Sequence, residues 1–163
     1  MDAVQHSLDA PRDVTGPSHD LYCLLGIDEN LHFPEDVLAS LQEPSNVATH
    51  HYTGRSSSPC MVIHVRNPVP WAPSRREGIP LLPGRYNDTV ESLAVAYGNV
   101  FRAFLATSET YTSLRLTSFF DVYPSGLIPS QIAGFSYTAL DQAFRSLPSS
   151  SLQTLLRRLL TTE

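Results

Sequence analysis

The clearest pattern of apolar positions lies in the second half of the chain. From about Asp88 to Ala106 they recur at helical spacing, which predicts a helix capped at Asp88 or Thr89. A second helix is predicted from about Ser130 to Leu147. The buried stripe of the first comprises Val90, Leu93, Tyr97, Val100, Phe101 and Phe104. That of the second comprises Ile132, Ala139, Leu140, Ala143, Phe144 and Leu147.

Two apolar runs predict buried strands. Cys60 to Val65 is short and flanked by Ser/Pro and by Asn67-Pro68, and Leu114 to Phe120 is rich in Thr and aromatic residues. Both lack full polar alternation, which is typical of strands that helices cover on both faces. We expect the first strand to be central and to neighbour the second. Alternating strands and helices predict an α/β fold with a mainly parallel sheet.

Shorter patterns complete the prediction. Helices are expected over Pro34 to Leu41 and Ser18 to Leu25. Residues 67–87 hold five prolines and are read as a surface loop. Residues 149–163 form an amphipathic segment in which Ser149 to Ser151 cap a helix with a leucine stripe, and Arg157 and Arg158 lie on another face. We expect this helix to pack on its own sheet rather than on a membrane or partner.

Composition and charge narrow the classes of protein. The length of 163 residues fits one domain, because domains usually hold roughly 100–200 residues. The net charge is −5 and the 11 basic residues form no run, so no DNA or RNA partner is expected. Cys23 and Cys60 lie in apolar runs and form no disulfide framework, which indicates a reducing compartment. The start has no signal-like pattern and no run approaches ~18 apolar residues. We therefore expect an intracellular protein, not secreted, without a membrane span.

Metal chemistry is a weak alternative. The adjacent His50 and His51, with His64 or His32, are the only histidine grouping of interest. Neighbouring residues do not face one site, and no Cys or Asp completes a ligand spacing. We expect neither a metal nor a cofactor.

The order of elements resembles a family. The strand Val62-Ile63-His64-Val65, the helix sequence Leu93-Ala94-Val95-Ala96-Tyr97-Gly98-Asn99 and the Ser125-Gly126 turn are similar to the second half of a macrodomain, the ADP-ribose-binding fold. In the first half, Asp2-Ala3-Val4 resembles the family's first motif strand, and Gly16 to Gly26 reproduces a glycine spacing. The resemblance implies a three-layer sandwich, a mainly parallel sheet with helices on both faces.

The resemblance also implies a site. Diphosphate would meet backbone N–H groups around Gly16 and Ser18 on one side and around Ser125, Gly126, Leu127 and Ile128 on the other. Both loops depart from the family pattern: Asp13 and Pro17 weaken the first, and the second lacks its second glycine. The alternative to a ligand-binding loop is that Ser125 to Ile128 form a structural turn that joins a strand to a helix.

The positions that match the family's hydrolytic pair carry Asp9 and Ser18. A carboxylate at Asp9 repels the diphosphate, and a serine hydroxyl is no general base near neutral pH. His19 or Asp20 could substitute, but helix geometry points neighbours in different directions. We therefore expect no catalytic residues.

Three functions follow from the resemblance. The first is a degenerate module that binds ADP-ribose or a related nucleotide weakly, without catalysis. The second is a structural subunit that kept the fold and lost the pocket, and the third is an ADP-ribosyl hydrolase. The family places two further strands before the one matched to Asp2. Their loss, their supply by another segment or chain, and a fragmentary sequence remain open. An exposed sheet edge would favour a protein partner.

Overall fold

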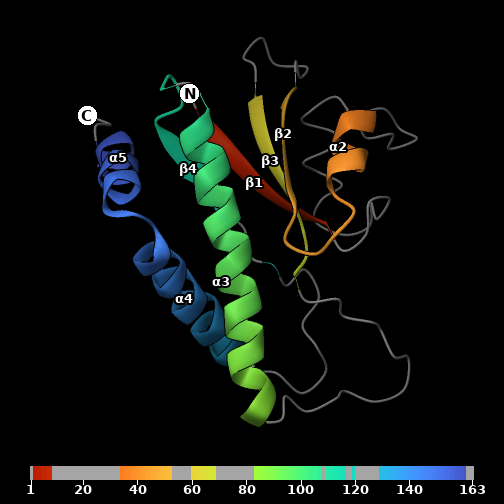
Figure 1. Ribbon diagram of the computed structural model, residues 1–163, viewed down its shortest axis with the longest axis vertical. Helices are drawn as coiled ribbons and strands as arrows, with labels where there is room; N and C mark the ends of the chain where they lie inside the picture. The colour runs from red at the N-terminus through yellow and green to blue at the C-terminus, as the bar shows by residue number, and fades with distance from the viewer. Residues whose placement is uncertain are drawn as a thin grey trace.

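A four-stranded sheet organises the molecule (Figure 1). The structure is a computed structural model that describes residues 2–8, 34–52, 60–68, 83–107, 109–116, 119 and 129–160. The strand order is β2-β3-β1-β4. The bounds are β1 (Asp2–Leu8), β2 (Val47–Tyr52), β3 (Cys60–Arg66) and β4 (Ser113–Arg115). β1 pairs in parallel with both β3 and β4, whereas β2 is antiparallel to β3.

The observed sheet differs from the sequence prediction in two respects. It is mixed, where the sequence predicted a mainly parallel sheet, because β2 was not predicted at all. Only residues 53–59 separate β2 from β3, which is too short for a parallel crossover, so the two strands pair as antiparallel neighbours. The predicted pairing of Cys60–Val65 with Leu114–Phe120 is also wrong. β3 is interior as expected, but β1 lies between it and β4.

The predicted strand over Leu114 to Phe120 is much shorter than its apolar run. β4 comprises three residues, and Leu116 and Phe119 are described outside it. Phe119 is buried in the core, so its hydrophobicity reflects packing of the segment after β4 rather than strand pairing. An apolar run alone does not separate these two causes of burial.

Helices cover the sheet unevenly. α3 (Pro83–Ala106), α4 (Pro129–Ser146) and α5 (Ser149–Leu160) lie on one side, and the short α2 (Glu35–Ser40) lies on the other side, near β2 (Figure 1). We call these sides the α3 face and the α2 face. Successive residues of a strand point to opposite faces, so Met61, Ile63 and Val65 belong to the α3 face, and Val62 and His64 to the α2 face.

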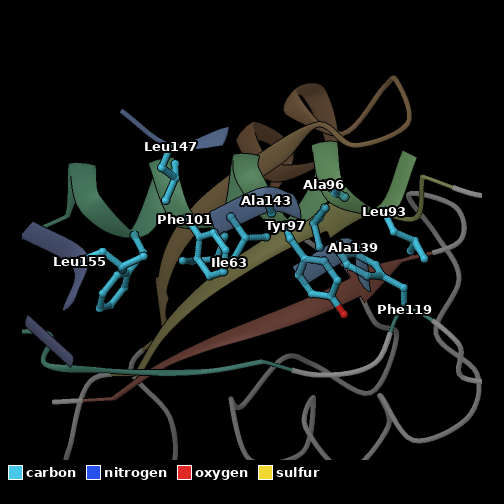
Figure 2. Close-up of a cluster of buried hydrophobic side chains, with 14 of the residues drawn as sticks. Ile63, Leu93, Ala96, Tyr97, Phe101, Phe119, Ala139, Ala143, Leu147 and Leu155 are labelled. Atoms are coloured by element: carbon cyan, nitrogen blue, oxygen red, sulfur yellow. The ribbon is translucent and has the colours of Figure 1, made fainter. Parts of the chain in front are cut away.

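The main core fills the α3 face (Figure 2). Ile63 is fully buried beneath α3, and all six residues of the predicted α3 stripe are buried. The predicted face of α4 is buried at Ala139 and Ala143, and partly at Leu140 and Phe144, and Leu147, directly after the helix, is buried too. The side chain of Ile132 lies outside the described residues. Burying one such apolar side chain contributes about 1.5–3 kcal/mol, so this face supplies most of the hydrophobic stabilisation.

Two helix starts differ from expectation. α3 begins at Pro83, so residues 83–87 are helical and the predicted loop over 67–87 is wrong there. Asp88 and Thr89 consequently lie inside the helix rather than at its cap. Proline suits the first helical position because it lacks the N–H that would be unpaired anyway. In α5 the serines from Ser149 form the first turn, and the Leu152 amide donates to the Pro148 carbonyl at 2.9 Å.

α5 is also rotated relative to its predicted faces. Arg158 was predicted to lie on another face than the buried leucine stripe, but only 6% of its surface is exposed, whereas Leu156 of the predicted stripe is 43% exposed. The Arg158 guanidinium donates to the carbonyls of Phe104 and Tyr111, each at 2.8 Å, and lies 4.2 Å over the Phe104 ring. It thereby adds a charged donor near the carboxyl end of α3, where the helix dipole favours a cation. The Phe104 carbonyl also accepts from the Thr107 amide at 3.1 Å. Burial lowers the pKa of Arg158, and Glu109 opposes that shift.

The described helices include none that is long and apolar enough to cross a bilayer.

Candidate functional site

The strand order reverses at β1. The chain proceeds from β1 to β2 and β3 on one side and then crosses to β4 on the other side. The first connection carries α2 on the α2 face, whereas α3, which links β3 to β4, packs on the α3 face (Figure 1). In open α/β sheets the crevice outside the carboxyl ends of the strands at such a switch point is where ligands bind. The carboxyl ends of β1 and β4 are therefore the first place to look for a site.

All sequence-predicted site residues lie outside the described residues. These are Asp9, Gly16, Ser18, Ser125, Gly126, Leu127 and Ile128. Their flanking elements are described. β1 ends at Leu8, directly before Asp9, and α4 begins at Pro129, directly after Ile128. Because β1 and β4 are parallel neighbours, the two candidate segments follow strands that end at the same edge of the sheet.

Asn67 lies at this edge, immediately after β3. It is 5% exposed, and its Nδ2 donates a hydrogen bond of 3.0 Å to the Phe119 carbonyl. The Phe119 ring packs edge-on against Tyr97 of α3, with ring centroids 4.8 Å apart. Burial raises the pKa of Tyr97, and a hydrogen bond with Ser136 of α4 opposes this. Figure 2 shows Phe119 at one end of the buried cluster, beside Leu93 and Tyr97.

A second polar cluster occupies the α2 face. The Tyr52 hydroxyl lies 2.9 Å from Nε2 of His64, and both residues are buried. The centroids of the His50 and Tyr52 rings lie 4.6 Å apart, and His50 Nδ1 lies 3.6 Å from the Asp36 carboxylate of α2. Burial raises the pKa of Tyr52 well above its usual range, and the Asp36 charge adds to the shift. At neutral pH the Tyr52 hydroxyl is therefore protonated and able to donate.

The adjacent histidines point apart, as the sequence indicated. His50 faces α2, whereas His51 Nδ1 lies 3.0 Å from the hydroxyl of Tyr111. Tyr111 belongs to the core on the α3 face. Within the described ranges, no group of three or more His, Cys, Asp or Glu side chains is arranged to hold a metal ion.

Two features of these clusters were not predicted from the sequence. Asn67 was read only as a breaker after β3, and the Tyr52–His64 contact was missed because β2 was not predicted. The available signal was Asn67 itself, a polar residue that follows Arg66 just after the mainly apolar run Cys60 to Val65. Such a residue needs a hydrogen-bond partner once it is buried.

Comparison of the chain with protein-family models, with curated proteins and with solved structures finds no match.

Proposed function

We propose that the chain is a macrodomain-like module, a three-layer sandwich that binds ADP-ribose or a related nucleotide weakly and without catalysis. The ligand lies across the carboxyl ends of β1 and β4. One observation carries this proposal: β1 and β4 are parallel neighbours at the point where the strand order reverses. The two segments that resemble the family's phosphate loops follow these two strands. A nucleotide that spans the edge would meet both.

Phosphate recognition would come from backbone N–H groups. α4 is 18 residues long and begins directly after Ile128, so its unpaired amides favour an anion next to Ser125 and Gly126. Asp9 and Asp13 bring negative charge toward the same ligand, and Pro17 supplies no N–H. Weak binding follows from this balance.

A titration with ADP-ribose, followed by amide NMR shifts, tests the proposal. We expect shifts that cluster at Gly16 to Ser18 and Ser125 to Ile128. Asp13→Asn strengthens binding because it removes a repelling charge, and Gly126→Val abolishes it because the added side chain blocks close approach of the backbone. Gly134→Val is the matched control, since a Cβ at Gly134 meets nothing within 4 Å.

Each of the two alternative functions corresponds to a different experimental result. If millimolar ADP-ribose shifts none of these amides, the binding proposal fails and the structural-subunit alternative replaces it. Hydrolysis is tested by release of ADP-ribose from a modified protein. We expect no release, because Asp9 and Ser18 occupy the positions of the family's hydrolytic pair. Turnover that disappears on substitution of Asp9 or Asp20 would support the hydrolase alternative instead.

A further inference from the structure

β2 lies at one edge of the sheet, and within the described part of the chain β3 is its only strand neighbour (Figure 1). In an antiparallel pair, residues bonded to the neighbouring strand alternate with residues whose N–H and C=O groups point away from it. The Arg66 N–H donates to the Asn46 carbonyl at 2.9 Å, so every second residue counted from Asn46 bonds to β3. Val47, Thr49 and His51 therefore direct their backbone groups away from β3.

These outward backbone groups are unpaired. Within the described ranges no hydrogen bond reaches them, and Thr49 and His51 are exposed. Natural sheets usually protect such an edge with a lysine, a proline, a bulge or an inward-pointing charge. The six residues of β2, VATHHY, include no lysine, proline, aspartate, glutamate or arginine, and their register with β3 is unbroken. This edge is therefore open to a further strand.

The opposite edge of the sheet differs. β4 comprises three residues, and α5 contacts it. A strand that is short offers few backbone groups to an incoming chain, which is one way in which natural sheets avoid pairing at an edge. Of the two edges, β2 is the one suited to pairing.

We propose that β2 is a homodimer interface, in which the β2 strands of two copies pair antiparallel about a two-fold axis at Thr49. In this register Thr49 lies opposite Thr49 of the second copy, and Val47 lies opposite His51. The outward N–H and C=O groups of all three residues then bond across the axis. The two four-stranded sheets become one continuous sheet.

The side chains of β2 suit this register. Threonines directly opposite each other form a favourable cross-strand pair. On the α2 face, where Asp36 already lies beside His50, the residue opposite His50 is the small Ala48. No carboxylate, lysine or arginine of β2 meets its own copy. The strand is thus complementary to itself, which favours a second copy of this chain over an unrelated strand.

The position of the axis allows a charge-swap test. Thr49→Lys places two like charges opposite each other, and so does Thr49→Glu, whereas a mixture of the two variants pairs opposite charges. Thr138→Lys is the matched control, because Thr138 is an exposed threonine on α4. Analytical ultracentrifugation up to millimolar protein would measure self-association, and circular dichroism would establish that each variant is folded.

We expect the unsubstituted protein and Thr138→Lys to form dimers with equal affinity. Each Thr49 variant alone should dimerise about tenfold more weakly, and the mixture should recover the affinity. A monomeric unsubstituted protein at millimolar concentration would overturn the proposal and leave a strand of another protein as the occupant of the edge. Dimers that Thr49→Lys does not weaken, or a mixture no stronger than the single variants, would overturn it too.

A second pair of variants tests the backbone groups themselves. Thr49→Pro removes an outward N–H without removing a bond to β3, and proline is tolerated on an edge strand in that orientation. Thr49→Val keeps the N–H. Only the proline variant should lose dimerisation, and equal self-association of the two would count against the proposal. If the charged variants do not fold, this pair carries the comparison. Self-association is measured without nucleotide, so its failure and the failure of the proposed function are separate results.

Discussion

The two faces of β3 are stabilised in different ways. On the α3 face, Met61, Ile63 and Val65 join a cluster that includes residues of α3, α4 and α5. On the α2 face, Val62 alternates with His64, which is buried against Tyr52. Apolar burial is non-directional and scales with area, whereas the polar contacts depend on single hydrogen bonds. The same strand therefore tolerates different substitutions on its two sides.

The largest effect is expected at Ile63. Ile63→Asp places an unpaired charge in the main core, which costs on the order of 5 kcal/mol and is comparable to the whole stability of a small domain. The variant should lose its cooperative unfolding transition in circular dichroism. Thr49→Asp is the matched control, because Thr49 is the exposed partner of Ile63 on β2. A soluble Ile63→Asp protein with unchanged melting would contradict the assignment of this face.

The attachment of α5 is tested at Arg158. Arg158→Met removes the guanidinium that donates to the buried carbonyls of Tyr111 and Phe104, of which Phe104 keeps its bond from the Thr107 amide. We expect a loss of about 2–4 kcal/mol in urea unfolding. Arg157→Met changes an exposed neighbour on the same helix and should stay within about 0.5 kcal/mol. Equal effects of the two substitutions would show that α5 is not rotated as described.

On the α2 face, Tyr52→Phe removes the hydroxyl next to His64 Nε2 and should cost about 1–2 kcal/mol in chemical unfolding. Tyr137→Phe is the control, since Tyr137 is 77% exposed and should lose nothing measurable. If Tyr52→Phe is equally silent, the hydrogen bond contributes nothing to the α2 face.

The raised pKa of Tyr52 predicts that the stability of the protein falls at alkaline pH. Its pKa is raised on folding, so the stabilisation is fully present below the unfolded value of 10.0 and is lost as pH rises above that value. Between pH 9 and pH 11 the unsubstituted protein should therefore lose more stability than Tyr52→Phe. Tyr97 has a raised pKa too and contributes in both proteins, so the difference between the two pH profiles isolates Tyr52.

The smallest effect is expected at Asp36. Its side chain is 70% exposed and lies 3.6 Å from His50, so solvent screens the pair. Asp36→Asn should change the unfolding free energy by less than about 1 kcal/mol, and Glu35→Gln, one residue earlier in α2, provides the baseline. A larger loss at Asp36 would mean that this contact holds α2 on the sheet.

The sequence predicted best where burial is continuous. The stripe of α3 from Val90 to Phe104 was identified completely, because one face of a long helix packs against the core and its period is visible in the chain. The burial of Ala139 and Ala143 of α4, and of Leu147 directly after it, was predicted for the same reason. The strand over Cys60 to Val65 was placed correctly, since a short apolar run between breakers leaves few alternatives.

Prediction failed where the structure of a segment depends on a partner outside that segment. β2 has polar residues on both faces, such as His50 on the α2 face and His51 on the α3 face, and only its pairing with β3 makes it a strand. Pro83 looked like part of the proline-rich loop, although it starts a helix. For the candidate site, the sequence named segments that lie outside the described residues, and the fold contributed the edge at which β1 and β4 end.

By itself, the sequence determined an α/β fold, the buried face and the end of its main helix, and its central strand. These properties depend on local periodicity, which each segment carries within itself. The tertiary structure decided the order of strands, the rotation of α5 that buries Arg158, and the meeting of Asn67 with Phe119. These depend on contacts between residues roughly fifty positions apart, such as Asn67 and Phe119. The energy of such contacts arises only when separate elements pack together, so no local pattern records it.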